Sequence, residues 1–207
     1  MVKSRSSHSS GGVDLVIELP TIYAISSAEN YAEGAIKLLN SLGIVDHLAF
    51  GTETPNLTAL NTIAEVLLKE PREYKNLLSH ELQKGISYPK ARENALMMYL
   101  SDIRKYIGIL SAPNNILAIE YLKALKKYES YIKPKVIERM GAGHNDLGLE
   151  GAISSATAIR SQIAKGEQEA LEKTMPTSSY SILRENISHG HIVPGLQTFE
   201  KEIIYTE

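Results

Sequence analysis

The sequence predicts an α/β fold with a parallel sheet covered by helices, and two short apolar segments support this prediction. VDLVIELP at residues 13–20 is a continuous apolar run closed by a proline, typical of a strand that is buried on both faces. HLAFGT at residues 47–52 reads as a second strand, and residues between the two follow helical spacing. A strand, a helix and a strand in this order form a βαβ unit, which implies a right-handed crossover.

The elements follow in order along the chain. The first strand is expected over residues 15–19, and a helix from about 27 to 42 is followed by Gly43, a residue that commonly ends helices. Beyond Gly51 the periodicity predicts helices over about 57–69, 71–83, 89–107 and from Pro113 onward, the last with Ile116, Ile119 and Leu122 as its buried stripe. IKPKVIERMG then returns to the sheet as a strand.

The same reading divides the chain into three regions. Residues 1–12 are rich in serine and glycine and predict a flexible tail. Residues 13–166 form the α/β core with a helical insertion, and residues 167–207 begin a mostly helical C-terminal region.

Composition excludes several classes of function. No apolar run approaches the roughly 20 residues that span a bilayer, and no signal peptide precedes the first predicted strand. The absence of cysteine excludes disulfides, thiolate metal sites and a cysteine nucleophile, and it fits a cytoplasmic protein. Because the formal net charge is −2, binding to nucleic acid requires a local basic patch.

The stretch GAISSATAIRSQIAKG at residues 151–166 combines hydroxyls with an arginine at a predicted helix start. Ser154 or Ser155 is the expected cap, Gly166 ends the helix, and Ala156, Ile159 and Ile163 form its apolar stripe. One interpretation is a capped surface helix with a solvated arginine. The other is an anion site, because helix N-termini and arginine both favour phosphate, and the strand before this stretch places it above the carboxyl edge of the sheet.

A basic run interleaved with tyrosines also leaves two interpretations open. It could be a solvated helix face, or a surface that tracks the phosphates of a folded RNA. Its members are Lys123, Lys126, Lys127, Lys133, Lys135 and Arg139. A metal site is not predicted, because His189 and His191 have no carboxylate or thiolate companions.

Seven ordered motifs carry a resemblance to a known family. They are VDLVIELP, SAENYAEGAIKLL, LAFGTE, GISYPKARENAL, PNNILAIEYLKAL, RMGAGHND and ISSATAIR. Together they closely resemble the bacterial tRNA(Met) cytidine acetate ligases. This resemblance implies a Rossmann-like nucleotidyltransferase core and an activity that uses ATP, with Mg²⁺, to convert acetate to acetyl-adenylate. The acetyl group then passes to the wobble cytidine of elongator tRNA(Met).

Site residues are carried over by motif. Gly51 is expected to let the backbone approach ATP, and Asn114, rather than Asn115, to hydrogen-bond the nucleotide. Arg160 is expected to hold phosphate with support from Ser155 and Thr157. The resemblance assigns no catalytic side chain. The predicted RNA contacts are Lys123, Lys126, Lys127, Lys133 and Lys135.

The sequence also departs from the family pattern. Thr52 stands where the family usually has serine, and the loop around His144 lacks a tyrosine, which leaves the role of this histidine unassigned. The HxGH motif of the family is absent from the sequence. We therefore expect this chain to be an incomplete, weakly active or inactive form of the ligase. The rival hypotheses are an adenylyltransferase for a small molecule and a non-catalytic nucleotide- or RNA-binding remnant.

Overall fold

The structure, a computed structural model, describes residues 13–101, 106, 108–139 and 156–190. The chain divides into two compact units, one of residues 18–139 and the other of residues 1–17 with 140–207. We describe each unit by itself.

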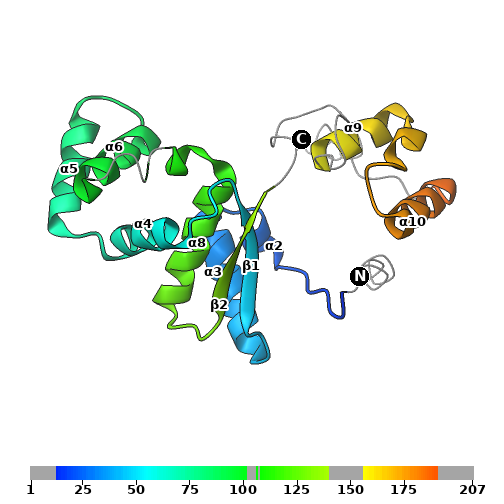
Figure 1. The fold of residues 1–207 in the computed structure, drawn as a ribbon, viewed down its shortest axis with the longest axis horizontal. Helices are drawn as coiled ribbons and strands as arrows, with labels where there is room; N and C mark the ends of the chain where they lie inside the picture. Colours follow the sequence, from blue (N-terminus) through cyan, green and yellow to red (C-terminus); the bar gives the residue numbers. More distant parts are fainter. Residues whose placement is uncertain (1–12, 102–105, 107, 140–155, 191–207) are drawn as a thin grey trace, which may run out of the picture. The chain divides into compact units, whose positions relative to one another are not determined.

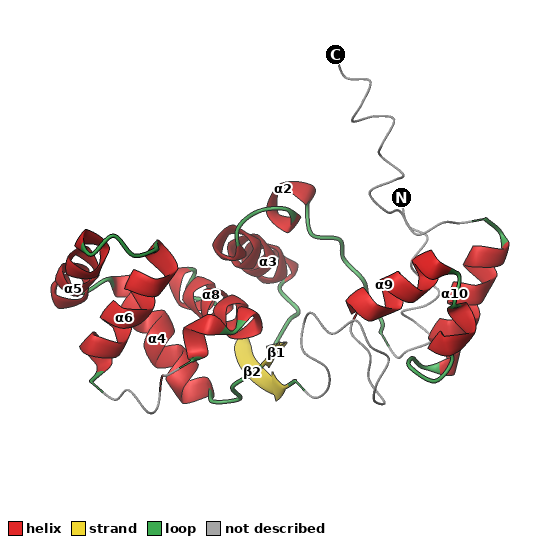
Figure 2. Cartoon of the chain, turned by 90° about the horizontal axis from the view of Figure 1, so that it is seen from above, coloured by secondary structure: helices red, strands yellow, loops and turns green. Residues whose placement is uncertain are grey.

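The unit of residues 18–139 contains a pair of strands and most of the helices (Figures 1 and 2). Its elements are α2 (Thr21–Ala24), α3 (Ala28–Leu42), β1 (His47–Thr52), α4 (Leu57–Lys69), α5 (Arg72–Gln83), α6 (Tyr88–Leu100), η1 (Ile109–Ser111), α8 (Pro113–Lys127) and β2 (Lys133–Glu138). The chain leaves β1 through α4, α5 and α6 and returns to β2 through α8, as a crossover between parallel strands requires.

Strands β1 and β2 are parallel, with His47 opposite Lys133 and Thr52 opposite Glu138. Phe50 and Thr52 face the core, whereas His47 and Ala49 are exposed, so the two faces of the sheet differ. Helix α8 contacts α3, α4 and β1 and is the centre of the core. The parallel pair and its helical crossover agree with the α/β class predicted from the sequence.

Local signals place several helix ends where the sequence predicts them. The Ser27 hydroxyl accepts a hydrogen bond from Asn30 N at the start of α3, and Gly43 ends this helix with a φ of +67°. Asn56 caps α4 through a 3.0 Å bond from Ala59 N. A Cβ on Gly34 would lie 2.3 Å from Cγ of Tyr23, so glycine at this position lets α2 pack against α3.

The predicted strand at residues 15–19 is wrong in this structure. The segment forms no strand, and Leu15, Val16 and Ile17 are between 41% and 60% exposed. A strand requires a hydrogen-bonding neighbour, and within the described residues β1 pairs with β2 and nothing pairs with this segment. An apolar run therefore indicates that a segment tends to be buried, but it does not show which strand would pair with it.

The helix predicted over 89–107 is shorter than expected. Helix α6 ends at Leu100, and Ser101 takes a left-handed φ of +57°. On α8 the predicted stripe is confirmed for Ile119 and Leu122, which are buried, whereas Ile116 is only half-buried.

The other unit contains α9 (Ala156–Lys165), η2 (Gln168–Leu171) and α10 (Thr177–Ser188). Gly166, with a φ of +78°, ends α9 as predicted, and Glu167 N donates to Gln162 O in the pattern of a Schellman cap. The predicted apolar stripe of α9 is only partly confirmed: Ile159 and Ile163 are half-buried, Ala156 is exposed, and the buried residues are Ala158 and Gln162. The buried face of α9 is one residue removed from the predicted stripe, which is a rotation of about 100° around the helix axis. Packing against neighbouring elements, including η2, selects this face.

Across the described ranges, no helix has both the length and the apolar character needed to cross a bilayer. The predicted boundaries at residues 12 and 166 stay predictions. The C-terminal end beyond residue 190, which includes His191, lies outside the described residues.

Candidate functional site

Gly51 lies near the carboxyl end of β1, opposite Ile137 of β2. A Cβ at this position would lie 3.0 Å from Cγ of Arg139, so the backbone here is already closely approached by a long side chain. Arg139 N donates to Thr52 O at 3.0 Å, which extends the strand pairing beyond β2. The open end of this sheet is the edge at which α/β proteins generally bind ligands.

Glu53 follows β1 and joins this strand end to the start of α8. Its carboxylate accepts hydrogen bonds from Asn115 N at 3.0 Å, from Asn114 N at 3.3 Å and from Asn114 Nδ2 at 2.6 Å. These contacts satisfy backbone donors that a helix N-terminus leaves without intrahelical partners. Asn114 itself is half-buried, so part of its surface remains open to a ligand.

Asn115 is fully buried and is used by the fold. Its Oδ1 accepts from Glu53 N and Thr54 N, both at 3.0 Å, and its Nδ2 donates to Thr54 Oγ1 at 3.1 Å. The two asparagines therefore have different surroundings. Asn114 is half-buried, whereas Asn115 fixes the loop, and the choice of Asn114 as the nucleotide-binding residue stays a prediction.

The Glu53 contacts also affect its ionisation. Burial raises the pKa of the Glu53 carboxyl, but the hydrogen bonds from Asn114 and Asn115 outweigh burial and hold the pKa below its ordinary value of 4.5. The carboxyl is therefore ionised at neutral pH.

We expect this carboxylate to make the stability of the chain depend on pH. Because the folded pKa is below the unfolded pKa, its contribution is present above about pH 4.5 and is lost as pH falls through the folded value. Urea unfolding measured between about pH 3 and pH 7 should show a shallower pH dependence for Glu53→Gln than for the wild type. Glu138→Gln, at an exposed residue of β2, is the control. Equal slopes for wild type and Glu53→Gln would contradict this prediction.

The predicted phosphate residues belong to the other unit. Arg160 is exposed and Thr157 half-buried on α9, whereas Ser155 lies outside the described residues. The described part of α9 begins at Ala156, and the predicted caps Ser154 and Ser155 lie outside the described residues. Arg160 lies away from the buried face of Ala158 and Gln162, so its side chain is available for a ligand.

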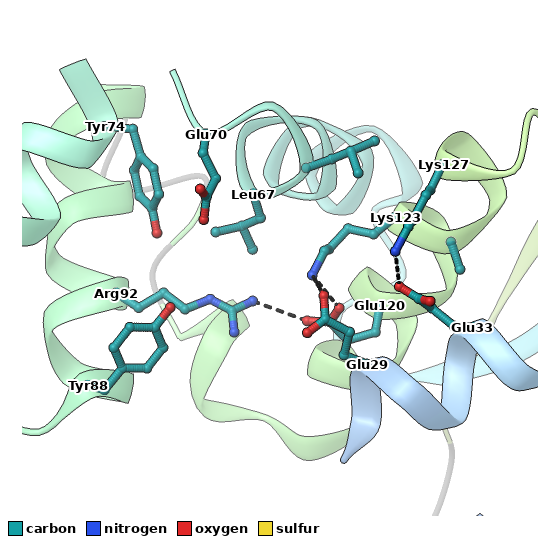
Figure 3. A pocket seen from close by; sticks show the side chains of 12 residues that line it. Glu29, Glu33, Leu67, Glu70, Tyr74, Tyr88, Arg92, Glu120, Lys123 and Lys127 are labelled. Carbon is teal, nitrogen blue, oxygen red and sulfur yellow. Dashed lines mark hydrogen bonds and ion pairs between the residues drawn. The ribbon is translucent and has the colours of Figure 1, made fainter. Parts of the chain in front are cut away.

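Lys123 and Lys127, predicted to contact RNA, are ion-paired inside this fold (Figure 3). Lys123 Nζ lies 2.6 Å from Glu120 and 2.9 Å from Glu29, and the side chain is only 14% exposed. Burial lowers the pKa of Lys123, but the hydrogen bonds to Glu120 and Glu29 outweigh this and raise it above the ordinary value. Lys127 Nζ lies 2.5 Å from Glu33. These contacts join α8 to α3.

The ion pairs line a cavity of about 490 Å³ between α3, α4, α6 and α8. Arg92 reaches across it from α6, with its Nη2 3.3 Å from Glu120, and Tyr74 and Tyr88 lie on either side of this arginine (Figure 3). Burial raises the pKa of Tyr74 to about 12. The cavity contains carboxylates and cations that already neutralise one another.

The remaining predicted RNA contacts, Lys126, Lys133 and Lys135, are exposed. Lys133 and Lys135 lie on the exposed face of the sheet, opposite His47 and Ala49. Tyr121, one of the tyrosines interleaved with the basic run, packs on Phe50 with ring centroids 5.6 Å apart. Within the part of the chain that the structure describes, no cluster of three His, Asp or Glu residues could hold a metal ion.

A profile of the HIGH Nucleotidyl Transferase family matches residues 7–206. The chain belongs to this family. Among curated relatives, the tRNA(Met) cytidine acetate ligase of Clostridium novyi (strain NT) is 45% identical over 183 residues, which cover 88% of this chain and 46% of that protein. The same-named protein of Caldanaerobacter subterraneus subsp. tengcongensis is 46% identical over 194 residues, covering 94% and 48%. The resemblance found in the sequence is confirmed.

Solved structures of Thermotoga maritima TmcAL support the same fold. The chain matches Thermotoga maritima TmcAL in its apo form with a TM-score of 0.80 and 36% identity, over 87% of this chain and 43% of that one. It matches the form of TmcAL bound with alpha-thio ATP with a TM-score of 0.76 and 35% identity, over 86% and 42%. A Rossmann-like α/β core is therefore shown, and the chain spans about half the length of the curated relatives it matches.

Sequence reasoning missed Glu53. Glu53 is the last residue of the LAFGTE motif. Its position next to a predicted ATP site does not indicate that its carboxylate accepts hydrogen bonds from a helix start 61 residues further along the chain. The available signal was the pair Pro113–Asn114 at a helix start, because an N-terminus without a side-chain cap of its own requires acceptors from elsewhere.

Proposed function

We propose that this chain carries the nucleotide-binding part of an ATP-dependent acetate ligase that forms N4-acetylcytidine at the wobble position of elongator tRNA(Met). Membership of the nucleotidyl transferase family supports the proposal, as do relatives named tRNA(Met) cytidine acetate ligase and a TmcAL structure with an ATP analogue. ATP with Mg²⁺, acetate and the tRNA are the proposed ligands, and the cytoplasm, which supplies them, is the proposed location.

One observation carries the proposal. Asn114 is a half-buried amide at the start of α8, held beside the carboxyl end of β1 by Glu53. We assign nucleotide binding to this edge, with Gly51 allowing close approach, and phosphate binding to Arg160 with Ser155 and Thr157.

The proposed chemistry needs no protein nucleophile. An acetate oxygen attacks the α-phosphorus of ATP, the bond to pyrophosphate breaks, and acetyl-adenylate forms. The exocyclic amine of cytidine then attacks the acetyl carbon, loses a proton and releases AMP. The residues of this chain contribute by orienting ATP and stabilising phosphate charge through Arg160, which are the roles that matter for such transfers.

Equilibrium binding separates this proposal from its rivals. Calorimetry on the 207-residue chain should show saturable binding of ATP in the presence of Mg²⁺. ATP–pyrophosphate exchange that requires acetate, measured with a panel of tRNAs present, distinguishes the ligase from an adenylyltransferase that acts on another small molecule. Binding of tRNA without any binding of ATP would contradict the proposal and favour a non-catalytic RNA-binding protein.

The exposed lysines are proposed to contact tRNA phosphates. We select Lys126, Lys133 and Lys135, because Lys123 and Lys127 already neutralise carboxylates within the fold. A lysine engaged with a buried carboxylate has less charge to offer an RNA phosphate.

We expect Lys135→Gln to weaken tRNA binding and to reduce the slope of log affinity against log salt concentration by roughly 0.7–0.9, the effect of one lost phosphate contact. Filter binding at several salt concentrations measures this slope. Lys69→Gln, at an exposed lysine on α4 outside the predicted group, should leave the slope unchanged. If Lys135→Gln behaves like Lys69→Gln, the sheet face does not contact RNA.

A further inference from the structure

The orientation of the Asn114 amide follows from the chemistry of its neighbour. Its side chain lies 2.6 Å from Glu53 Oε1, which is an acceptor with no hydrogen to give when the carboxyl is ionised. The amide nitrogen must therefore face Glu53, and the carbonyl oxygen Oδ1 must face the other way. Among the described residues Oδ1 of Asn114 accepts no hydrogen bond, so it remains available to a ligand.

The neighbouring contacts keep Glu53 itself in place. Its second carboxylate oxygen accepts from Asn115 N at 3.0 Å, and its own backbone N–H donates to Oδ1 of the buried Asn115 at 3.0 Å. A carboxylate held by both its side chain and its backbone has few alternative rotamers. The direction in which Asn114 presents its amide is consequently fixed before any ligand binds.

The same contacts determine whether the phosphates of a nucleotide or its hydrogen-bond donors can bind at the start of α8. A helix N-terminus ordinarily attracts phosphate, but the N–H groups of Asn114 and Asn115 already donate to a negative side chain. A phosphate placed here would meet the charge of Glu53 and the oxygen of Asn114. A group that donates a hydrogen bond would find an acceptor.

We propose that Glu53 is a positioning residue that holds Asn114 with its carbonyl oxygen toward the ligand, so that this position selects a hydrogen-bond donor of the nucleotide. This inference rests on the proposed function, because it assumes that a nucleotide binds at the β1–α8 edge. The donor is either the exocyclic amine of adenine or a hydroxyl of ribose. The phosphates then lie away from the start of α8.

The test compares the affinity for ATP with the affinities for related nucleotides, so its result is a set of ratios. Calorimetry on the wild-type chain measures the affinity for ATP, for inosine triphosphate, which has a carbonyl oxygen in place of the amine, and for 2′-deoxy-ATP and 3′-deoxy-ATP. We expect one of these analogues to bind at least about tenfold more weakly than ATP, the scale of one hydrogen bond. Inosine triphosphate identifies the amine as the donor, and a deoxy analogue identifies the corresponding hydroxyl.

Glu53→Gln is the decisive variant. A glutamine can also donate, so Asn114 can turn its amide around, and the discrimination should fall to within roughly threefold, since less than one hydrogen bond then separates the ligands. A merely structural role would weaken all four ligands by a common factor and leave their ratios unchanged. Asn114→Ala, which keeps the bonds of Asn115, should abolish the same discrimination and provides the answer if Glu53→Gln does not fold.

The outcomes are distinguishable. If Glu53→Gln binds ATP with the wild-type affinity ratios, the role of Glu53 is overturned while the proposed function stands; where Glu53→Gln does not fold, wild-type ratios in Asn114→Ala overturn the inference in the same way. The role of Glu53 is also overturned if the wild-type chain binds ATP and all three analogues with affinities that differ by less than about threefold. If the wild-type chain binds no ATP, the proposed function fails and this inference fails with it.

Discussion

Replacing Arg160 with alanine is expected to weaken ATP binding by about 1.5–3 kcal/mol, the scale of a lost charge-assisted hydrogen bond to phosphate. This corresponds to roughly a 10- to 150-fold increase in Kd. The guanidinium is exposed and lies off the buried face of α9, so its removal should cost little stability. Arginine suits this role because its planar donors can bind two phosphate oxygens together.

Calorimetry with ATP and a thermal melt on the same preparations measure both halves of this prediction. Arg184→Ala on α10 is a matched control, because this arginine is also exposed on a helix of the same unit. Equal ATP affinities for Arg160→Ala and Arg184→Ala would show that ISSATAIR is a surface helix, the other interpretation that the sequence left open.

Replacing Glu120 with alanine is expected to lower the free energy of unfolding by about 3 kcal/mol, the range found when one member of a buried ion pair is removed. Glu120 is 4% exposed, and its two carboxylate oxygens pair with Arg92 and Lys123. Its loss leaves both cations partly buried with less compensation. Arg92 is the more affected, because its Nε is already buried without a hydrogen-bond partner in the described part of the chain.

Urea unfolding at neutral pH measures this cost. The control is Glu65→Ala, which breaks an exposed pair with Lys69 and should cost much less stability, because solvent screens an exposed pair. A cost for Glu120→Ala within 1 kcal/mol of that for Glu65→Ala would mean that solvent in the adjoining cavity screens the cluster, and the structural role assigned to Lys123 would be wrong.

Local sequence signals predicted those parts of the fold that local interactions determine. Helix α4 has the bounds 57–69 that its periodicity indicates, and α3 runs from Ala28 to Leu42 between its caps Ser27 and Gly43. The segment at residues 15–19 could not be predicted in this way, because strand formation depends on a neighbour distant in sequence. The buried face of α9 depends likewise on elements that pack against it.

The candidate site shows the same limit. Gly51, Asn114 and Arg160 were selected by motif, and their exposures suit the proposed roles, but nucleotide binding at them stays a prediction. The basic run illustrates why a pattern of charges is insufficient. Lys123 and Lys126 look alike in the sequence, yet one is paired with buried Glu120 and the other is exposed, since acceptors on other turns and helices decide which lysine is neutralised.

The central claim is that ATP binds at the β1–α8 edge, and an NMR titration of the ¹⁵N-labelled chain with ATP and Mg²⁺ tests it most directly. We expect saturable shifts of the backbone amides of Gly51 and Asn114 that follow one binding isotherm. Saturable shifts confined to the cavity around Arg92 and Lys123, or the absence of any saturable shift, would contradict the claim.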